Sequence, residues 1–322
     1  MVQPVELKTK LPVKLSNDVM STTTKLWEIL VASCKGDRDK VKSLVNECHE
    51  LVYGQYNYTP PIHFAVREGH TELVKYLLDQ GALDPAYKTY PFLDSLITIA
   101  EERSYTAIAT LLREYEADPE RHKFKGDNGE IMYERTKEQQ EFQRAVNHNE
   151  LNKVASILKE HPEFAKDETM SWGEGILMMP ANKKNKNLLE LLLNHGAKVP
   201  CISKWGRAYY FKHYDIAKFL LENGMNANHI TWHHVSLLHD MAQEGNLPKA
   251  KLLIDHGADI DVIEEEYKST PLGLAARWGQ TEMVQYLIEQ GADRNKSAAD
   301  WSRPVEWARS RGHTKIEKLL AT

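Results

Sequence analysis

One block of about 33 residues recurs along most of this chain, and this period constrains the fold more than any other feature. Residues 270–293 read TPLGLAARWGQTEMVQYLIEQGAD, residues 60–82 read PPIHFAVREGHTELVKYLLDQGA, and residues 236–259 read SLLHDMAQEGNLPKAKLLIDHGAD. A unit this short cannot bury an apolar core alone, so it stacks on its neighbours. The 322 residues therefore predict one elongated array of similar units rather than two globular domains.

Each block contains the pattern of two short helices. In its second half, Met283 and Leu287 recur at helical spacing. Gly279 stands between the two apolar segments, and glycine readily adopts the positive φ with which many helices end. Thr270 before Pro271 is a helix start, because a hydroxyl cap is followed by a proline at the first helical position. The block thus predicts a helix, a tight turn, a second helix and an extended connection.

The block resembles the ankyrin repeat, whose signature is T-P-L-H-x-A. Thr270, Pro271 and Leu272 match its first positions, and residues 61–65 read PIHFA. The resemblance implies an all-α repeat solenoid of about nine helix-turn-helix units joined by hairpin fingers. We define the start of each unit as the position of the signature threonine. The units then start at residues 27, 60, 95, 140, 175, 203, 236, 270 and 303.

Two intervals between these starts are irregular. The 45 residues from 95 to 140 hold an insertion, and the 28 residues from 175 to 203 are too few for a full finger. We also expect a change of curvature across residues 118–205, with two four-repeat halves. The predicted organisation is an N-terminal tail at residues 1–20, repeats one to three at 21–117, an insertion loop at 118–136, and repeats four to nine with a C-terminal cap at 137–322.

Composition argues against several classes of function. The net charge of −5 argues against a nucleic-acid binder, which presents a dominant basic face. No apolar run approaches the ~18 residues of a membrane helix, and the first residues lack the apolar core of a secretory signal. Cys34, Cys48 and Cys201 have no paired spacing, so neither a disulfide framework nor a zinc knuckle is expected. We expect a cytoplasmic monomer without a cofactor.

The ankyrin resemblance also indicates where a partner protein would bind. It implies that the concave surface is built from the finger before each start and from the end of the first helix. In this chain those positions are rich in aromatic side chains and arginine, which dominate the hot spots of protein interfaces. The predicted partner-binding residues are Tyr56, Arg67, Phe92, Trp172, Tyr210, Phe211, Trp232, His233, Tyr267, Arg277 and Trp278.

The weakly matching fifth and sixth units carry a further group of large side chains. We hypothesise that function, rather than packing, selected Met178, Met179, Trp205, Tyr209 and Tyr210. The acidic run Glu264, Glu265 and Glu266 on a later finger is instead interpreted as solvated charge. Residues 127, 128 and 130 in the insertion lack the spacing of a calcium loop, and they are interpreted as part of a surface loop.

An enzyme or metal-dependent sensor that uses the groove as a cleft is the alternative. Four histidines and one aspartate fall within residues 229–240, and histidine is the commonest metal ligand. His239 occupies the signature position, which the resemblance implies is bonded to neighbouring backbone, and His229 ends the preceding turn. Only His233 and His234 remain, and adjacent residues of an extended finger tend to point to opposite faces. No P-loop, dinucleotide-binding glycine triplet or HExxH motif is present, so an interaction protein is favoured. Host-directed or toxin-neutralising bacterial proteins would share this fold. The residues do not distinguish these roles from that of a general interaction protein.

Overall fold

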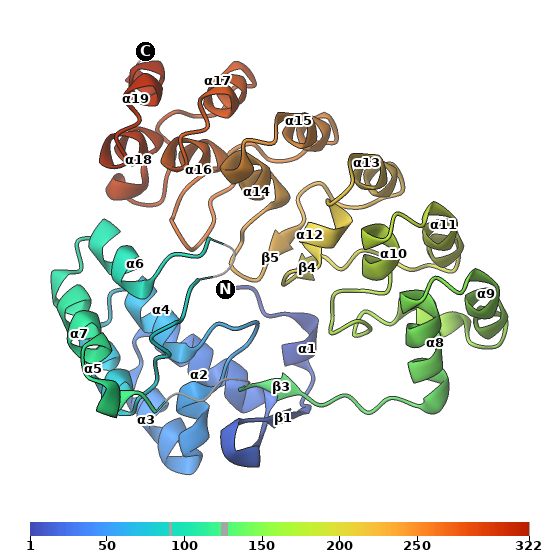
Figure 1. Ribbon diagram of the computed structural model, residues 1–322, viewed down its shortest axis with the longest axis horizontal. Coiled ribbons are helices and arrows are strands. Elements are labelled where there is room, and N and C mark those ends of the chain that lie inside the picture. Colours follow the sequence, from blue (N-terminus) through green and yellow to red (C-terminus); the bar gives the residue numbers. More distant parts are fainter. Residues whose placement is uncertain (90–91, 124–127, 322) are drawn as a thin grey trace. The chain divides into compact units, whose positions relative to one another are not determined.

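The computed structural model describes residues 1–89, 92–123 and 128–321, and it divides into two compact units. The N-terminal unit is Glu6–Glu134, and the C-terminal unit combines Met1–Val5 with Arg135–Thr322. In the described part of both units, the helices follow one another in pairs, each made of two helices joined by a tight turn (Figure 1). The predicted all-α repeat solenoid is confirmed.

The N-terminal unit contains three helix pairs within its described residues. The helices of each pair contact each other, and the first helices of successive pairs pack together. A short helix, α1 (Val5–Lys8), and three 3₁₀ turns, η1 (Ser16–Asp18), η2 (His49–Tyr53) and η3 (Pro119–Arg121), complete the helical part. The pairs are α2 (Thr23–Lys35) with α3 (Arg38–Glu47), α4 (Pro61–Arg67) with α5 (Thr71–Asp79), and α6 (Leu96–Glu102) with α7 (Thr106–Glu116).

The C-terminal unit contains six further pairs in the part of the chain that the structure describes. Figure 1 shows its first helices side by side in one layer and its second helices in another. It also holds η4 (Pro162–Lys166), η5 (Asp300–Ser302) and the parallel strands β4 (Ile202–Ser203) and β5 (Ile230–Thr231). The pairs are α8 (Lys137–Asn147) with α9 (Leu151–Glu160), α10 (Met178–Asn182) with α11 (Lys186–Asn194), α12 (Arg207–Tyr210) with α13 (Tyr214–Glu222), α14 (Leu237–Glu244) with α15 (Leu247–Asp255), α16 (Pro271–Arg277) with α17 (Thr281–Glu289), and α18 (Pro304–Ser310) with α19 (Thr314–Ala321).

The helices follow the repeat frame predicted from the sequence. Thr270 caps α16, and its hydroxyl accepts a hydrogen bond from Gly273 N at 3.3 Å. The residue that precedes each second helix lies ten positions after the predicted start of its unit, as Gln280 does after Thr270. The same spacing holds for Asp37, His70, Tyr105, Glu150, Asn185, His213 and Asn246.

Several turns between paired helices are held by a side chain of the next pair. His313 Nε2 lies 3.2 Å from the carbonyl oxygen of Arg277. The His313 ring also lies against Gly279, where a Cβ would come within 2.8 Å of Cε1. Gly279 has a φ of 75°, so both backbone conformation and space require glycine there. The polar contact recurs at His70 to Cys34 (2.9 Å), His213 to Asn182 (3.0 Å) and Gln280 to Gln243 (2.8 Å).

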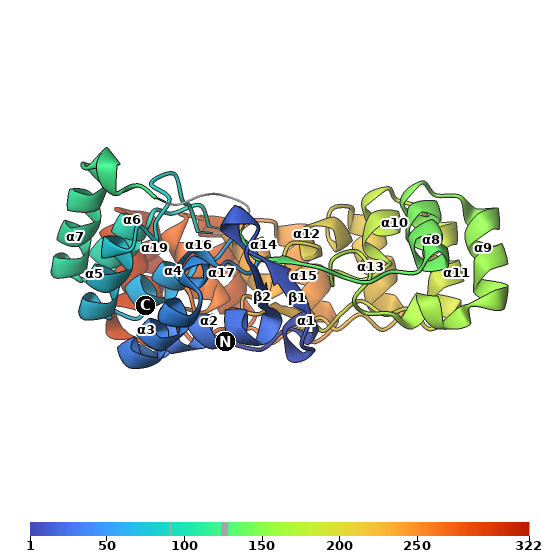
Figure 2. The ribbon, with the colours of Figure 1, turned by 90° about the horizontal axis from the view of Figure 1, so that it is seen from below.

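The tail expected at residues 1–20 and the loop expected at 118–136 are not irregular throughout. Strand β1 (Pro12–Lys14) pairs antiparallel with β2 (Met20–Thr22) and with β3 (Glu130–Ile131). Figure 2 shows β1 and β2 side by side in the N-terminal unit. The buried side chain of Val13 lies at the centre of this sheet. The two segments are ordered because each supplies the backbone partners that the other needs. Asp127, considered for a cation loop, lies outside the described residues.

Glu6 ties these segments to the second helix pair. Its carboxylate is buried and accepts a hydrogen bond from the Tyr56 hydroxyl at 2.5 Å and another from the Tyr133 hydroxyl. Tyr56 is therefore an internal structural residue and not, as predicted, part of an exposed surface. An N-terminal glutamate was not expected to be buried, because nothing in residues 1–20 repeats.

The fifth and sixth pairs depart most from the regular pattern. Their first helices, α10 and α12, have only 5 and 4 residues, whereas α16 has 7 and α14 has 8. The boundary between the units falls after the third pair, so the described helix pairs divide into three and six. The prediction of two four-repeat halves is therefore wrong. The change of curvature remains a prediction. None of the described helices has both the length and the apolarity needed to cross a bilayer.

Candidate interaction surface

Most of the predicted partner-binding residues lie in the protein interior. Trp172 is 57% exposed, and Trp278 is partly buried. The expectation of exposure is wrong for the others, because their side chains pack against neighbouring groups on the fingers and at the ends of the first helices. The buried residues are Tyr56, Arg67, Phe92, Tyr210, Phe211, Trp232, His233, Tyr267 and Arg277.

Arg277 is enclosed by aromatic rings of its own and the following pair. Its guanidinium carbon lies 4.2 Å from the ring centroid of Tyr267, 4.1 Å from that of Trp278 and 5.2 Å from that of Trp307. Tyr267 also meets Trp278 and Trp307 edge-to-face, with centroids 5.6 and 5.8 Å apart. A planar cation stacks favourably on such rings. Arg277, Tyr267 and Trp278 thus join the last two helix pairs.

Arg67 and Trp232 also have internal roles. Arg67 Nε donates to Glu68 Oε1 at 2.8 Å, and its guanidinium carbon lies 5.1 Å from the Phe64 ring centroid. The backbone carbonyl of Trp232 accepts a hydrogen bond from Val2 N at 3.1 Å, and its ring meets His233 edge-to-face. These contacts account for both side chains without a partner protein.

A buried carboxylate holds the finger before α12. Glu174 accepts backbone hydrogen bonds from Lys204 at 3.0 Å, from Trp205 at 3.2 Å and from Gly206 at 2.9 Å. Burial raises the pKa of Glu174, while Lys204 and the backbone donors lower it. The hydroxyl of Tyr210 donates to the Glu174 carbonyl, and burial together with the nearby carboxylate raises the pKa of Tyr210 well above its usual value. Glu174 therefore fixes the position of Trp205 from the preceding unit.

The acidic run Glu264 to Glu266 is not the solvated charge that the sequence suggested. Glu264 is buried and accepts hydrogen bonds from the backbone N–H groups of Glu266, at 2.5 Å, and of Tyr267, at 2.8 Å. Burial, and then the charge of Glu266, raise the pKa of Glu264 to about 7. The side chain closes its own finger by binding backbone donors that would otherwise lie unsatisfied.

The histidines of residues 229–240 are used by the fold. The Ser236 hydroxyl and the Ser269 carbonyl lie 2.8 and 3.2 Å from the two ring nitrogens of His239. This is the backbone-bonding role implied by the ankyrin signature. The Ser203 hydroxyl lies 2.7 Å from His229 Nε2. Burial lowers the pKa of both His229 and His239 to about 3, so both rings are neutral near pH 7.

His233 and His234, the residues of the metal-dependent alternative, pair with different carboxylates. His233 Nδ1 contacts Glu266 Oε1 inside the protein, whereas His234 Nδ1 lies 3.2 Å from Glu265 Oε1 with its side chain 41% exposed. His234 has a φ of 61°, which places it at the finger turn. The two rings thus differ in environment, as expected for adjacent finger residues.

Three neighbouring aromatic side chains of the fifth and sixth units that reach the surface form a row, which we call the aromatic row: Trp172, Trp205 and Tyr209. The ring centroids of Trp172 and Trp205 are 6.3 Å apart, and those of Trp205 and Tyr209 are 5.4 Å apart. Trp172 is exposed, and the other two are partly exposed. The sequence singled out all three, but it gave no means of separating them from the aromatic residues that are buried.

Residues 205–212, of which 207–210 form α12, bring Trp205 and Tyr209 to the surface. Trp205, Ala208, Tyr209 and Lys212 carry accessible side chains at intervals of three or four residues, whereas Arg207, Tyr210 and Phe211 are buried. Trp172 itself has a φ of 59°. This left-handed conformation is costly for a bulky side chain, and such strain gathers at functional sites.

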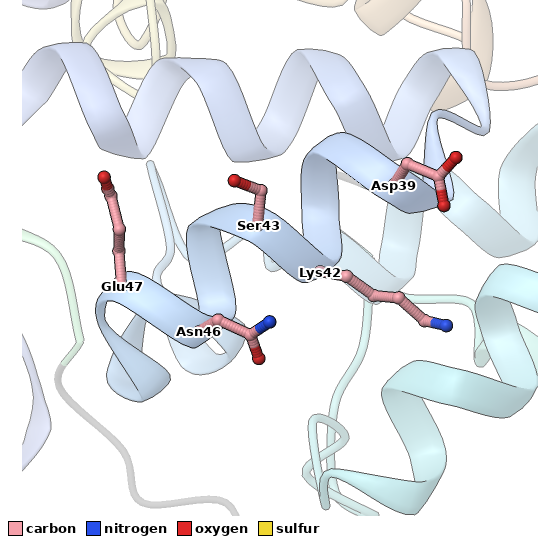
Figure 3. Close-up of a pocket in the computed structure, with 5 residues that line it drawn as sticks. All are labelled: Asp39, Lys42, Ser43, Asn46 and Glu47. Carbon is pink, nitrogen blue, oxygen red and sulfur yellow. The ribbon is translucent and has the colours of Figure 1, made fainter.

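A depression lies beside α3 and is lined by polar side chains from successive turns of that helix (Figure 3). Glu47 points toward α2, where Lys25 pairs with it at 2.8 Å. This polar face fits the outer surface of the predicted N-terminal cap. The lining residues are Asp39, Lys42, Ser43, Asn46 and Glu47.

Comparison with known families agrees with this architecture. A family model of ankyrin repeats matches residues 29–123, 205–298 and 238–322. The matched ranges together include more than half of the chain and leave out residues 1–28 and 124–204, of which the second stretch contains the fourth and fifth pairs.

Several curated proteins are similar over shorter stretches. ARF GTPase-activating protein Git of Drosophila melanogaster is 36% identical over 84 residues, which are 26% of this chain and 12% of that protein. Rabankyrin-5 of Homo sapiens is 39% identical over 98 residues, with 27% and 8% covered. Protein fem-1 homolog A-like of Mus musculus is 34% identical over 107 residues, with 33% and 15% covered. The chain thus spans a small fraction of the length of these relatives.

Proposed function

This chain belongs to the ankyrin repeat family, and from that membership and the aromatic row we propose that it is a non-enzymatic protein that binds a partner protein. Ankyrin repeats are protein-interaction modules. The observation that carries the proposed site is the row itself, because neighbouring exposed aromatic rings on a folded surface mark interaction sites. Trp172, Trp205 and Tyr209 supply large contact area with few rotatable bonds.

The site differs from the one predicted by sequence alone. It keeps Trp172 from the original set and adds Trp205 and Tyr209 from the irregular units. It leaves out Arg277 and Tyr267, because their contacts with each other and with Trp307 explain them as packing. The partner surface is therefore placed on the fifth and sixth pairs rather than along the full set of fingers.

The chemistry of the relatives does not transfer with the repeat. The match to the GTPase-activating protein Git covers only 12% of that protein, so its named activity is not proposed for this chain. His233 and His234 contact separate glutamates, so the alternative that places both histidines in one metal site is not proposed. A cytoplasmic location, expected from cysteine usage, is part of the proposal.

Comparative affinity capture tests the proposed site. The protein and a Trp172→Ala/Trp205→Ala variant are immobilised, and proteins retained from native lysate are quantified by mass spectrometry. Phe219→Ala is the matched control, because Phe219 lies on the second helix of the sixth pair under the ammonium of Lys186. We expect proteins that are retained by the wild type and the control but lost from the double variant. Equal retention by all three, with unchanged thermal unfolding, would refute the proposed site.

A further inference from the structure

The irregular units form a basic island in an acidic protein. Residues 183–212 contain six lysines and one arginine but a single acidic residue, Glu190, within a chain of net charge −5. This basic excess lies in the fifth and sixth pairs, which also carry the aromatic row. The island consists of Lys183, Lys184, Lys186, Lys198, Lys204, Arg207 and Lys212.

Several of these charges are already matched by carboxylates. Arg207 is buried, and its Nη2 donates to Asp240 Oδ1 at 2.8 Å. Lys184 pairs with Asp215 at 3.0 Å, and Lys186 lies 3.8 Å from Glu190. These three residues contribute little net charge to a ligand at the aromatic row.

Lys183 and Lys212 differ because their ammonium groups contact neutral oxygen atoms. Lys183 Nζ donates to the Asn147 carbonyl at 2.6 Å, and Lys212 Nζ donates to Asn182 Oδ1 at 2.8 Å. Both side chains are exposed. Lys212 follows Tyr209 by three residues, just beyond the end of α12, and its bond to Asn182 brings its ammonium group to the residue that precedes Lys183. The two positive charges therefore lie beyond the Tyr209 end of the aromatic row.

The spacing of the row fits an extended chain. Alternate residues of a strand are about 6.6 Å apart and point to the same side. The centroid distances of 6.3 and 5.4 Å along Trp172, Trp205 and Tyr209 are close to this repeat. An extended segment could thus place every second side chain on a ring while its backbone stays straight.

Resting on the proposed function, we propose that the aromatic row binds an extended acidic segment of the partner protein. Apolar side chains at alternate positions pack on Trp172, Trp205 and Tyr209, and carboxylates at the end of the segment that passes Tyr209 lie beside Lys212 and Lys183. A peptide is favoured over a nucleic acid, because two lysines are a small basic surface, whereas nucleic-acid binding rests on many phosphate contacts.

Labelled synthetic peptides test this specificity by fluorescence anisotropy. The probes are a peptide of alternating leucine and serine that ends in glutamates, the same peptide with glutamine in place of glutamate, the same peptide with lysine, and a single-stranded DNA oligonucleotide. We expect the acidic peptide to bind at least about tenfold more tightly than the glutamine peptide at about 50 mM salt, with the advantage reduced at about 300 mM. Equal binding of the acidic and lysine peptides, or tighter binding of the DNA, would overturn the proposal.

Charge-reversal variants locate the effect. Lys183→Glu/Lys212→Glu should remove the preference for the acidic peptide and leave binding of the glutamine peptide unchanged. Lys251→Glu is the matched control, because Lys251 is exposed on α15 beside Tyr286, away from the row in sequence. An equal loss in the control would refute a local role for Lys183 and Lys212. If the acidic preference is absent while Trp172→Ala/Trp205→Ala still loses partners in lysate, the proposed function stands and the acidic ligand is wrong.

Discussion

The ring of Trp172 lies 6.3 Å from the ring of Trp205, and the two residues belong to consecutive repeat units. This contact joins exposed side chains, whereas the rings of Tyr210, Trp232 and Tyr267 are buried. Glu174 holds Trp205 in place from the preceding unit. The irregular part of the array therefore combines a rigid support with an accessible aromatic surface.

Replacing Glu174 tests that support. In Glu174→Gln one amide oxygen cannot satisfy the three backbone donors, so we expect the free energy of unfolding to fall by about 1–3 kcal/mol. Glu168→Gln, at an exposed position, should change it by less than about 0.5 kcal/mol. Urea unfolding measures both. Unchanged or greater stability of Glu174→Gln would show that the cost of burying the carboxylate exceeds the gain from its hydrogen bonds.

Replacing Arg277 tests whether its aromatic surroundings are packing. Arg277→Lys keeps the charge but loses the planar group that stacks on Tyr267 and Trp278. We expect a loss of about 1–2 kcal/mol in thermal unfolding and no change in partner binding. Arg309→Lys, 55% exposed, serves as control and should cost less than about 0.5 kcal/mol. Weaker partner binding by folded Arg277→Lys would restore Arg277 to the interaction surface.

A glycine pair tests the sheet in the N-terminal unit. Gly129 has a φ of 101°, and a Cβ there would lie 1.9 Å from the Gln55 carbonyl oxygen. Gly129→Ala should therefore lower the free energy of unfolding by more than about 2 kcal/mol. Gly257 has a φ of 84° but no atom within 4 Å of the same position, so Gly257→Ala should cost about 1 kcal/mol. Equal losses in calorimetry would contradict the close approach of residue 129 to Gln55.

The buried signature histidine predicts a dependence on pH. His239 has a folded-state pKa of about 3, below its unfolded value near 6.5, so its contribution is fully present above pH 6.5 and is lost as pH falls toward 3. The stability advantage of the wild type over His239→Gln should shrink by about 2 kcal/mol between pH 6.5 and pH 5. Asp240 and Glu264, with pKa values raised to about 7, act in the opposite direction in both proteins. The difference between urea unfolding curves isolates His239, and a gap independent of pH would contradict this account.

The repeat frame could be predicted because local patterns determine it. Thr270 caps a helix, Pro271 fixes φ at its first position, and Gly279 adopts a positive φ. These effects are local, so they can be predicted without knowledge of tertiary contacts. The sheet formed by β1 and β3 could not be predicted, because its strands are short, lie far apart in sequence and do not repeat. Tertiary pairing alone orders them.

The candidate site was only partly predictable for a related reason. Tyr267 and Trp172 occupy similar finger positions, yet Tyr267 is buried against Trp307 and Trp172 is exposed. Both residues are aromatic and lie at the same position of the repeat, so only the packing of the next unit distinguishes them. The burial of Glu264 could not be predicted for the same reason. The backbone N–H groups that it binds come close to its carboxylate only when the finger is folded.

The most direct test of the account is the affinity of a captured partner for the wild type and for Trp172→Ala/Trp205→Ala, measured by isothermal titration calorimetry. Loss of two central aromatic rings should weaken binding by about 100-fold or more, with little change in the midpoint of thermal unfolding because Trp172 is largely exposed. An affinity within about threefold of the wild type would contradict the claim that the aromatic row is the binding surface.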